Sequence, residues 1–247
     1  MILAIDAGNS RVKWGWYDAR RPGGAGWSSI ANVSLIEFAA SSDHINPFSA
    51  THENPARIVV SNVAGDGAEQ LIVNWTSVFE AAPEWVRGER ERCGVRSRYE
   101  RPETLGPDRW AALVAARALE PGRACLVANS GTCTTADMLS ADGEFTGGLI
   151  LPGIDLMRYV LHEHTGRLPL QEGRFVAMPR NTLDAIETGC RHAQAGAVER
   201  MFRTLGPGAA CLVSGGGGRA LIERLEGLPC RYVENLVLEG LAQIGAS

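Results

Sequence analysis

The chain has 247 residues, a formal net charge of −4 and an apolar content of 45%. These values are typical of a globular protein with one large domain or two of ordinary size, and they argue against a general nucleic-acid-binding surface. No apolar run is long enough to cross a bilayer, and the chain starts with a strand-like run rather than a secretory leader. We therefore expect a cytoplasmic protein that binds neither membranes nor nucleic acid. Its six cysteines form no C-x-x-C pair, which predicts free thiols.

In the first half of the chain, apolar runs broken by Gly and polar residues predict mainly strands. Residues 41–55 are polar and predict a loop, whereas residues 83–95 follow no clear pattern. The predicted elements are strands at 2–6, 12–17, 27–33 and 57–63, a helix at 67–79, a Pro- and Gly-containing loop at 101–107, and a helix at 108–119.

The second half repeats this order of elements after Pro121-Gly122. Its predicted elements are strands at 124–130, 132–139, 145–151, 209–214 and 230–233, and helices at 154–163, 182–205 and 236–244, with a further helix after Gly215–Gly218. The repeated order predicts an α/β protein with mixed sheets flanked by helices. We expect two domains, over residues 1–121 and 122–247.

Two turns of similar build indicate phosphate binding. The first strand runs into Asp6-Ala7-Gly8-Asn9-Ser10-Arg11-Val12-Lys13, and a later strand runs into Asn129-Ser130-Gly131-Thr132. Gly lets the main chain approach an anion closely, and the short polar side chains beside it add hydrogen-bond donors. Two such turns facing one another would hold a polyphosphate, which predicts an enzyme that uses a nucleotide.

The order and spacing of several motifs resemble the type III pantothenate kinases, members of the acetate kinase/sugar kinase/Hsp70/actin superfamily. The resemblance covers nearly the whole chain. It implies duplicated ribonuclease H-like (actin-like ATPase) domains, ATP-dependent phosphorylation of pantothenate to 4'-phosphopantothenate in coenzyme A biosynthesis, and a homodimer. The motifs that carry it are Asp6–Lys13, Gly106-Pro107-Asp108-Arg109, Asn129–Asp137, Phe145–Gly153, Asn181–Gly189 and Gly215–Gly218.

The resemblance implies that ATP contacts the first turn and the second one. Asp6 would orient Mg²⁺ through water, without direct protein ligands to the metal, and Lys13 would place a positive charge near the transferred phosphate. Simpler interpretations are an Asx turn for Asp6, a solvated strand lysine for Lys13 and an ordinary strand residue for Thr132. The implied ATP-binding residues are Asp6, Ala7, Gly8, Asn9, Ser10, Arg11, Val12, Lys13 and Thr132.

Asp108 is implied as the general base that takes the proton from the pantothenate hydroxyl. The alternative is that Asp108 caps the following helix. Arg109 would bind the pantothenate carboxylate or, alternatively, lie in solvent in the first helical turn. The implied pantothenate-binding residues are Tyr99, Gly106, Pro107, Asp108, Arg109 and Thr182, of which Tyr99 could serve packing alone and Thr182 could be a helix cap.

Asn129 departs from the family pattern, which has Asp there as a ligand of K⁺ or NH₄⁺. Asn keeps a carbonyl oxygen but loses the charge, so cation activation is either lost or met by other ligands, with Asp137 as a candidate. Gly215–Gly218 would lie against adenosine, and Phe145–Gly153 would shape the dimer contact.

Two other functions stay open. A kinase of the same superfamily could act on another small alcohol such as a sugar, because fold does not fix substrate. A regulatory protein could retain the fold and act by contacting the transcription machinery, although the sequence contains no recognisable DNA-binding module.

Overall fold

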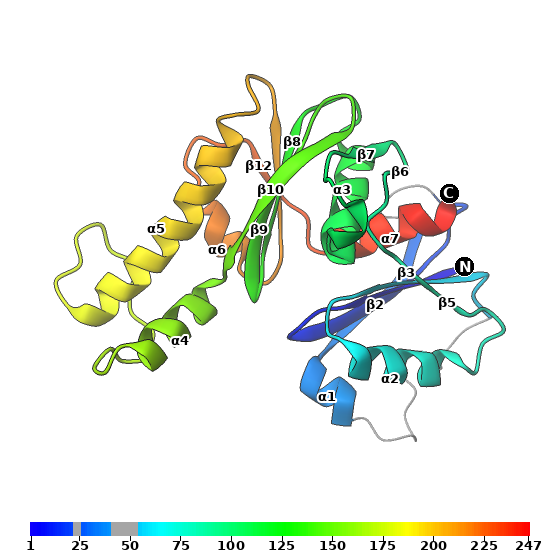
Figure 1. Ribbon diagram of the computed structural model, residues 1–247, viewed down its shortest axis with the longest axis horizontal. Helices are drawn as coiled ribbons and strands as arrows, with labels where there is room; N and C mark the ends of the chain where they lie inside the picture. Colours follow the sequence, from blue (N-terminus) through cyan, green and yellow to red (C-terminus); the bar gives the residue numbers. More distant parts are fainter. Residues whose placement is uncertain (22–25, 41–53) are drawn as a thin grey trace. The chain divides into compact units, whose positions relative to one another are not determined.

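A computed structural model describes residues 1–21, 26–40 and 54–247 (Figure 1). The chain divides into unit 1, made of Met1–Leu119 and Asn235–Ser247, and unit 2, made of Glu120–Glu234. Most of the predicted loop at 41–55 lies outside the described residues. Residues 235–247, which we predicted in the second domain, belong to unit 1 instead. The reason is that the apolar helix formed there buries its side chains in unit 1.

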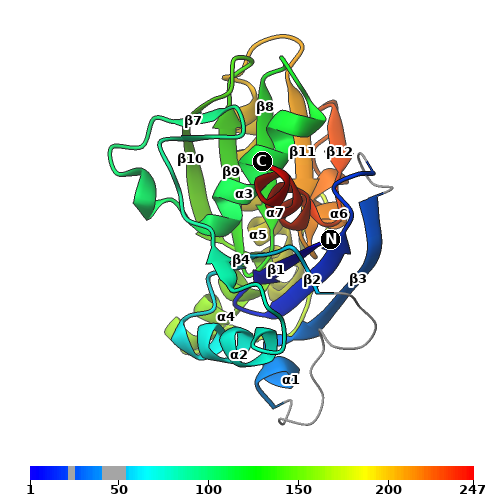
Figure 2. The same ribbon diagram turned by 90° about the vertical axis from the view of Figure 1, so that its right-hand side faces the viewer.

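Unit 1 is built on a mixed five-stranded sheet with the order β3-β2-β1-β4-β5. The first three strands are antiparallel neighbours, as the predicted hairpin requires, whereas β4 and β5 run parallel to β1. Figure 2 shows β1, β2 and β3 side by side. The strands are β1 (Ile2–Ala7), β2 (Arg11–Tyr17), β3 (Trp27–Ser34), β4 (Arg57–Asn62) and β5 (Pro83–Trp85).

Helices cover both faces of this sheet. Phe38 and Trp75, from the two helices that follow β3 and β4, pack edge to face over Leu3, Ile5 and other apolar strand residues. The last helix packs on the opposite face, where Gly245 lies against Ile2 and Val59. The helices are α1 (Leu35–Ala40), α2 (Asp66–Thr76), α3 (Pro107–Leu119) and α7 (Leu236–Ala246). Between β5 and α3, the chain forms β6 (Glu91–Arg92), β7 (Val95–Ser97) and a 3-10 helix (Pro102–Thr104).

Unit 2 repeats this plan with the strand order β12-β11-β8-β9-β10. Strand β8 pairs antiparallel with β9 and parallel with β11, just as β1 pairs with β2 and β4. Helices α5 and α6 bury apolar side chains such as Val198 and Leu221 on one face of the sheet. The elements are β8 (Cys125–Ser130), β9 (Cys133–Leu139), β10 (Glu144–Pro152), α4 (Ile154–His164), α5 (Thr182–Phe202), β11 (Ala210–Ser214), α6 (Gly218–Ile222) and β12 (Cys230–Tyr232).

The predicted α/β class with mixed sheets flanked by helices is thus confirmed, and the two units share one strand topology. Helix α1 was not predicted, and the unclear region 83–95 contains the short strands β5 and β6. None of the helices in the described part of the chain is long and apolar enough to span a membrane.

Candidate active site

Asp6 lies at the end of the buried strand β1 in unit 1. Its register neighbours are Lys13 on β2 and Ser61 on β4. The apolar residues before Asp6 are buried in the core, so the Asp6 carboxylate lies at the edge of that core. The pairing therefore gathers a carboxylate, an ammonium and a hydroxyl at one end of the sheet.

The turn beyond Asp6 leaves its backbone open at the surface. The amide of Gly8 donates to the Arg11 carbonyl at 2.9 Å, which closes the turn, and Asn9, Ser10 and Arg11 are exposed. Ala7 and Val12 are buried register partners beneath it. The turn can therefore offer main-chain and side-chain donors to an anion, as its sequence predicts. The Arg11 side chain itself donates to Asn32 at 2.9 Å.

Asp6 and Asp108 form an electrostatically coupled pair within unit 1. Burial and, to a smaller extent, the negative charge of Asp108 raise the pKa of Asp6 to about 7, although the positive charge of Lys13 opposes both effects. Burial also raises the pKa of Asp108, although the amide and the charge of Arg109 oppose it. A buried carboxyl with a raised pKa is stabilised when it binds a proton or a cation. The pair is therefore a candidate catalytic site.

Asp108 is the second residue of α3, so it is not the N-cap residue of this helix. The helix starts at Pro107, whose missing N–H is unneeded at that position. The Asp108 carboxylate accepts from the Arg109 amide at 2.8 Å. A Cβ on Gly106 would lie 2.6 Å from an Asp108 carboxylate oxygen, so Gly106 leaves the space that this carboxylate occupies.

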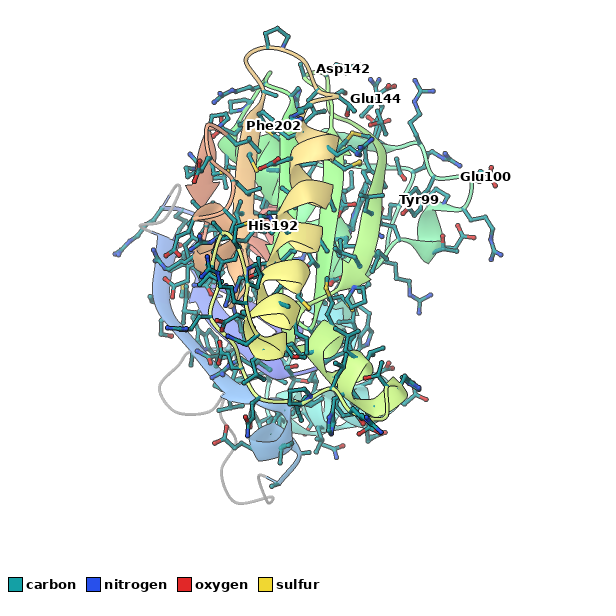
Figure 3. All side chains as sticks on the ribbon, turned by 90° about the vertical axis from the view of Figure 1, so that its left-hand side faces the viewer. Tyr99, Glu100, Asp142, Glu144, His192 and Phe202 are labelled. Carbon is teal, nitrogen blue, oxygen red and sulfur yellow. The ribbon has the colours of Figure 1, made fainter. Side chains whose placement is uncertain are left out.

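Arg109 is only 7% exposed, which rules out the alternative of a solvated first-turn arginine. Its guanidinium lies 5.9 Å from the centre of the Tyr99 ring. Tyr99 follows β7 and lies next to Glu100, as Figure 3 shows. The structure therefore brings together two of the residues that we predicted for pantothenate binding, as a cation–π pair.

A cavity of about 380 Å³ opens beside the start of α3. Its wall includes Pro107 and Leu105 together with Asn62, Trp85 and Arg87 from elsewhere in unit 1, and also the acidic Glu69 and Glu103. The sequence did not predict these other residues, because they come from β4, α2, the β5–β6 region and the 3-10 helix, and no motif or spacing links them. Only the folding of the chain brings these residues to the same cavity.

The second turn, in unit 2, is uncharged. Asn129 and Ser130 end β8, the exposed Thr132 lies in the turn, and the amide of Gly131 donates to the Cys133 carbonyl at 3.0 Å. Asn129 pairs with Thr135 in the register, and Asp137 pairs with Val127. Because strand residues alternate between faces, Asn129 and Asp137 lie on the same face of the sheet.

The glycine-rich segment after β11 packs directly on this turn. The amide of Gly217 donates to the Ser130 carbonyl at 2.9 Å, and a Cβ on Gly217 would lie 2.5 Å from the Ser130 hydroxyl. Gly215 has a φ of +89° and touches Ser130 and Asn129 so closely that any side chain would overlap them. These glycines are thus needed for backbone packing, whether or not they also approach a ligand.

Thr182 is the first residue of α5 and its side chain is exposed. The predicted alternative of a capping role is wrong, because Asn181 caps the helix by accepting from the Asp184 amide at 2.9 Å. Thr182 and Thr132 belong to unit 2, whereas Asp6, Asp108 and Tyr99 belong to unit 1.

The carboxylates near the first turn fit a metal ion whose other ligands are water and phosphate oxygens. Among the described residues, no group of three or more His, Cys, Asp or Glu side chains could hold a metal ion. Asp6 and Asp108 nevertheless supply carboxylate oxygens, which Mg²⁺ prefers, and Mg²⁺ commonly keeps water and phosphate oxygens as its remaining ligands.

Comparisons with known proteins agree with this chemistry. A family model described as type III pantothenate kinase matches residues 2–204. The chain is 50% identical over 246 residues to the type III pantothenate kinase of Aromatoleum aromaticum, covering 99% of this chain and 97% of that protein.

Two solved structures show the same fold at low identity. One, from Campylobacter jejuni and named as a Baf family transcriptional activator, has a TM-score of 0.62 at 19% identity and covers 98% of this chain and 96% of its own. The other, named as a 2-dehydro-3-deoxygalactonokinase from Sinorhizobium meliloti, has a TM-score of 0.61 at 15% identity and covers 100% and 98%. The actin-like ATPase and sugar kinase fold predicted from the sequence is thereby confirmed.

Proposed function

The chain belongs to the type III pantothenate kinase family, and from that premise we propose that it transfers the γ-phosphoryl group of ATP to pantothenate. The product is 4'-phosphopantothenate, and the reaction is the first step of coenzyme A biosynthesis. The observation that carries this proposal is the coupled pair of carboxyl groups, Asp6 and Asp108, at the end of β1 and the start of α3.

In this proposal Asp108 is the general base. The pantothenate hydroxyl oxygen attacks the γ-phosphorus, the bond from that phosphorus to the β–γ bridging oxygen breaks, and ADP leaves. Asp108 takes the hydroxyl proton as the bond to phosphorus forms. Its raised pKa makes it a stronger base than an ordinary Asp, although it is still weak towards an alcohol. It therefore acts late in a loose transfer, in which positioning and electrostatics dominate.

ATP contacts the turn from Asp6 to Lys13, and Thr132 of unit 2. The exposed turn backbone supports this role, as does the gathering of Asp6 and Lys13 in one register pair. Lys13 places positive charge near the transferred phosphate, and Asp6 orients the hydrated metal. Mg²⁺, when bound with ATP, supplies neutralising charge on the β- and γ-phosphates.

Pantothenate contacts Tyr99, Gly106, Pro107, Asp108 and Arg109, with Thr182 as a further contact. The buried Arg109 guanidinium suits the substrate carboxylate, because its planar fork matches a carboxylate and its position over Tyr99 limits its motion. Its burial distinguishes this arginine from the exposed ones of the described chain.

The protein acts as a homodimer in the cytoplasm, where ATP is available. Support for the dimer comes from unit 2, where α4 buries no residue within its own chain. Leu149 and Ile150 of β10, and Tyr159 and Val160 of α4, are exposed apolar side chains. Exposed apolar side chains of this kind are typical of a surface that a second copy covers.

The test is ATP-dependent phosphorylation of pantothenate by the purified protein, with Mg²⁺ and with or without K⁺ or NH₄⁺. Sugars serve as competing acceptors, and sedimentation measures the oligomeric state. Turnover of pantothenate above every other acceptor is the expected result. Turnover of a sugar alone would assign the protein to another kinase activity. An absence of phosphoryl transfer to any acceptor would favour the regulatory alternative.

A further inference from the structure

Helix α5 carries a buried side-chain amide, that of Gln194, to which the proposed chemistry assigns no role. Gln194 is 3% exposed, and its helix neighbours Ala195 and Val198 belong to the buried apolar cluster of unit 2. An alkyl side chain, like those of its helix neighbours, would pack at this position without leaving a buried polar group. A buried amide without partners costs stability, so its presence indicates a specific set of hydrogen bonds.

Both hydrogen bonds of this amide go to the second turn. Nε2 of Gln194 donates to the Ser130 hydroxyl at 2.9 Å and to the Thr134 hydroxyl at 2.6 Å. Ser130 and Thr134 are register partners on β8 and β9, and they are the last pair before the turn that holds Gly131 and Thr132. One side chain therefore clamps the two strands together where the turn begins.

Ser130 is also where the glycine-rich segment meets this turn. Its carbonyl accepts from the Gly217 amide, and its hydroxyl lies against the bare α-carbon of Gly217. On the other side of the turn, the Thr132 carbonyl accepts from the Gly153 amide at 2.9 Å. Any shift of Ser130 is thus passed to the Gly215–Gly218 segment and to Thr132 by direct contact.

We propose that Gln194 is a positioning residue for the nucleotide, because it fixes Ser130 and Thr134 and through them the turn at Thr132 and the segment Gly215–Gly218. This inference rests on the proposed function, in which Thr132 contacts ATP. Gln194 is buried beneath the turn and acts through the two hydroxyls, without touching the nucleotide. Displacements well below the size of an atom at such a site are sufficient to weaken binding and to slow transfer.

The experiment compares Gln194→Met with Thr188→Val. Met has nearly the same length and no donor, so both hydroxyls lose their partner. Thr188 is a matched control, because it is buried on the same helix and its hydroxyl hydrogen-bonds the backbone of Val176, away from the turn. Binding of ADP is measured by calorimetry, together with KM for ATP, KM for pantothenate, kcat and the melting temperature.

For Gln194→Met we expect a rise of about tenfold in the Kd for ADP and in KM for ATP, while KM for pantothenate stays within twofold. For Thr188→Val both nucleotide constants should stay within twofold even if the melting temperature falls equally. A folded Gln194→Met protein with unchanged ADP affinity overturns the inference. So does an equal loss of ADP affinity in Thr188→Val, because the effect would then be general loosening of the helix.

Thr134→Val is a second variant, and it decides the question if Gln194→Met does not fold. It removes one acceptor and keeps the shape, so we expect a rise of about threefold in the Kd for ADP, whereas an unchanged Kd overturns the inference. The proposed function is tested separately by wild-type turnover. A wild-type protein that binds ADP but leaves pantothenate unmodified contradicts the kinase activity, and the ADP comparison still decides the role of Gln194. A wild-type protein that binds no ADP overturns both.

Discussion

The β1–β2 turn of unit 1 and the β8–β9 turn of unit 2 share one backbone plan but differ in charge. Asp6 and Asn129 occupy the same position on their strands, one residue before the end. The next antiparallel strand places Lys13 opposite Asp6 but Thr135 opposite Asn129. The parallel strand places a serine opposite both residues, Ser61 in unit 1 and Ser214 in unit 2.

This difference indicates a division of labour between the duplicated units. Unit 1 holds the titratable groups, because the carboxyl of Asp6 is coupled to Asp108 and opposed by Lys13. Unit 2 holds neutral donors whose positions are set by hydrogen bonds such as those from Gln194. We infer that the charged turn serves phosphoryl transfer and the metal, whereas the neutral turn serves nucleotide positioning.

Removing the charge of Asp108 should have the largest effect. For Asp108→Asn we expect kcat to fall by about 10²- to 10⁴-fold, because the amide cannot accept the hydroxyl proton. The Asp108 carboxylate accepts the Arg109 amide in the first turn of the helix, and an Asn oxygen can do the same, so the melting temperature should change little. Steady-state kinetics and thermal unfolding measure the two effects. A folded variant with more than a tenth of the wild-type kcat would remove Asp108 as the base.

Asp6→Asn makes the first turn resemble the second and is the next largest change. We expect a loss of about 10²-fold in kcat/KM for ATP, together with a higher Mg²⁺ concentration for half-maximal rate, because the carboxylate that orients the hydrated metal is gone. The Mg²⁺ titration separates this role from a structural one. If the variant is slow at every Mg²⁺ concentration but shows the wild-type half-maximal point, Asp6 does not act through the metal.

The same substitution should change how stability depends on pH in the absence of nucleotide. The folded-state pKa of Asp6 is about 7, above its ordinary value of 3.8. Between these values the folded protein binds more protons than the unfolded chain, so the contribution of Asp6 is fully present below about pH 4 and is lost as the pH rises to about 7. At pH 8, Asp6→Asn should therefore be more stable than wild type by about 1–4 kcal/mol.

Denaturant unfolding of both proteins at pH 5, 6, 7 and 8 measures this difference. Comparing the two proteins cancels the contribution of other carboxyls that titrate in the opposite direction. One of these is Asp184, because hydrogen bonds from Arg174 and Asn181 lower its pKa. Parallel pH profiles for wild type and variant would mean that Asp6 ionises normally in the folded protein.

Asn129→Asp makes the second turn resemble the first and should have the smallest effect. We expect the wild-type rate to depend on K⁺ or NH₄⁺ by less than about threefold, and the variant to show a larger dependence, because the added carboxylate supplies a charged oxygen ligand. Rates with K⁺, NH₄⁺ and a bulky organic cation measure it. A strong K⁺ requirement in wild type that Asn129→Asp leaves unchanged would locate the ligands elsewhere, and Asp137→Asn is then the variant to compare.

Much of the fold was predictable because it follows from local pattern. The hairpin of β1 and β2, and its counterpart β8 and β9, appear in the sequence as apolar runs interrupted by Gly and polar residues. The helix starts were less well predicted. Pro107 takes the first position of α3 and Asn181 caps α5, so neither Asp108 nor Thr182 occupies the N-cap position.

The sequence by itself determined the α/β class, the duplicated order of elements and the two turns, because period and turn chemistry are properties of adjacent residues. Only the tertiary structure decided that α7 packs in unit 1, that Arg109 is buried over Tyr99 and that Gln194 clamps Ser130 and Thr134. It also decided that Asp6 and Asp108 share one electrostatic environment. These pairings join residues that are distant in the chain, and burial, which raises the pKa of Asp6, exists only once the surrounding strands and helices have packed.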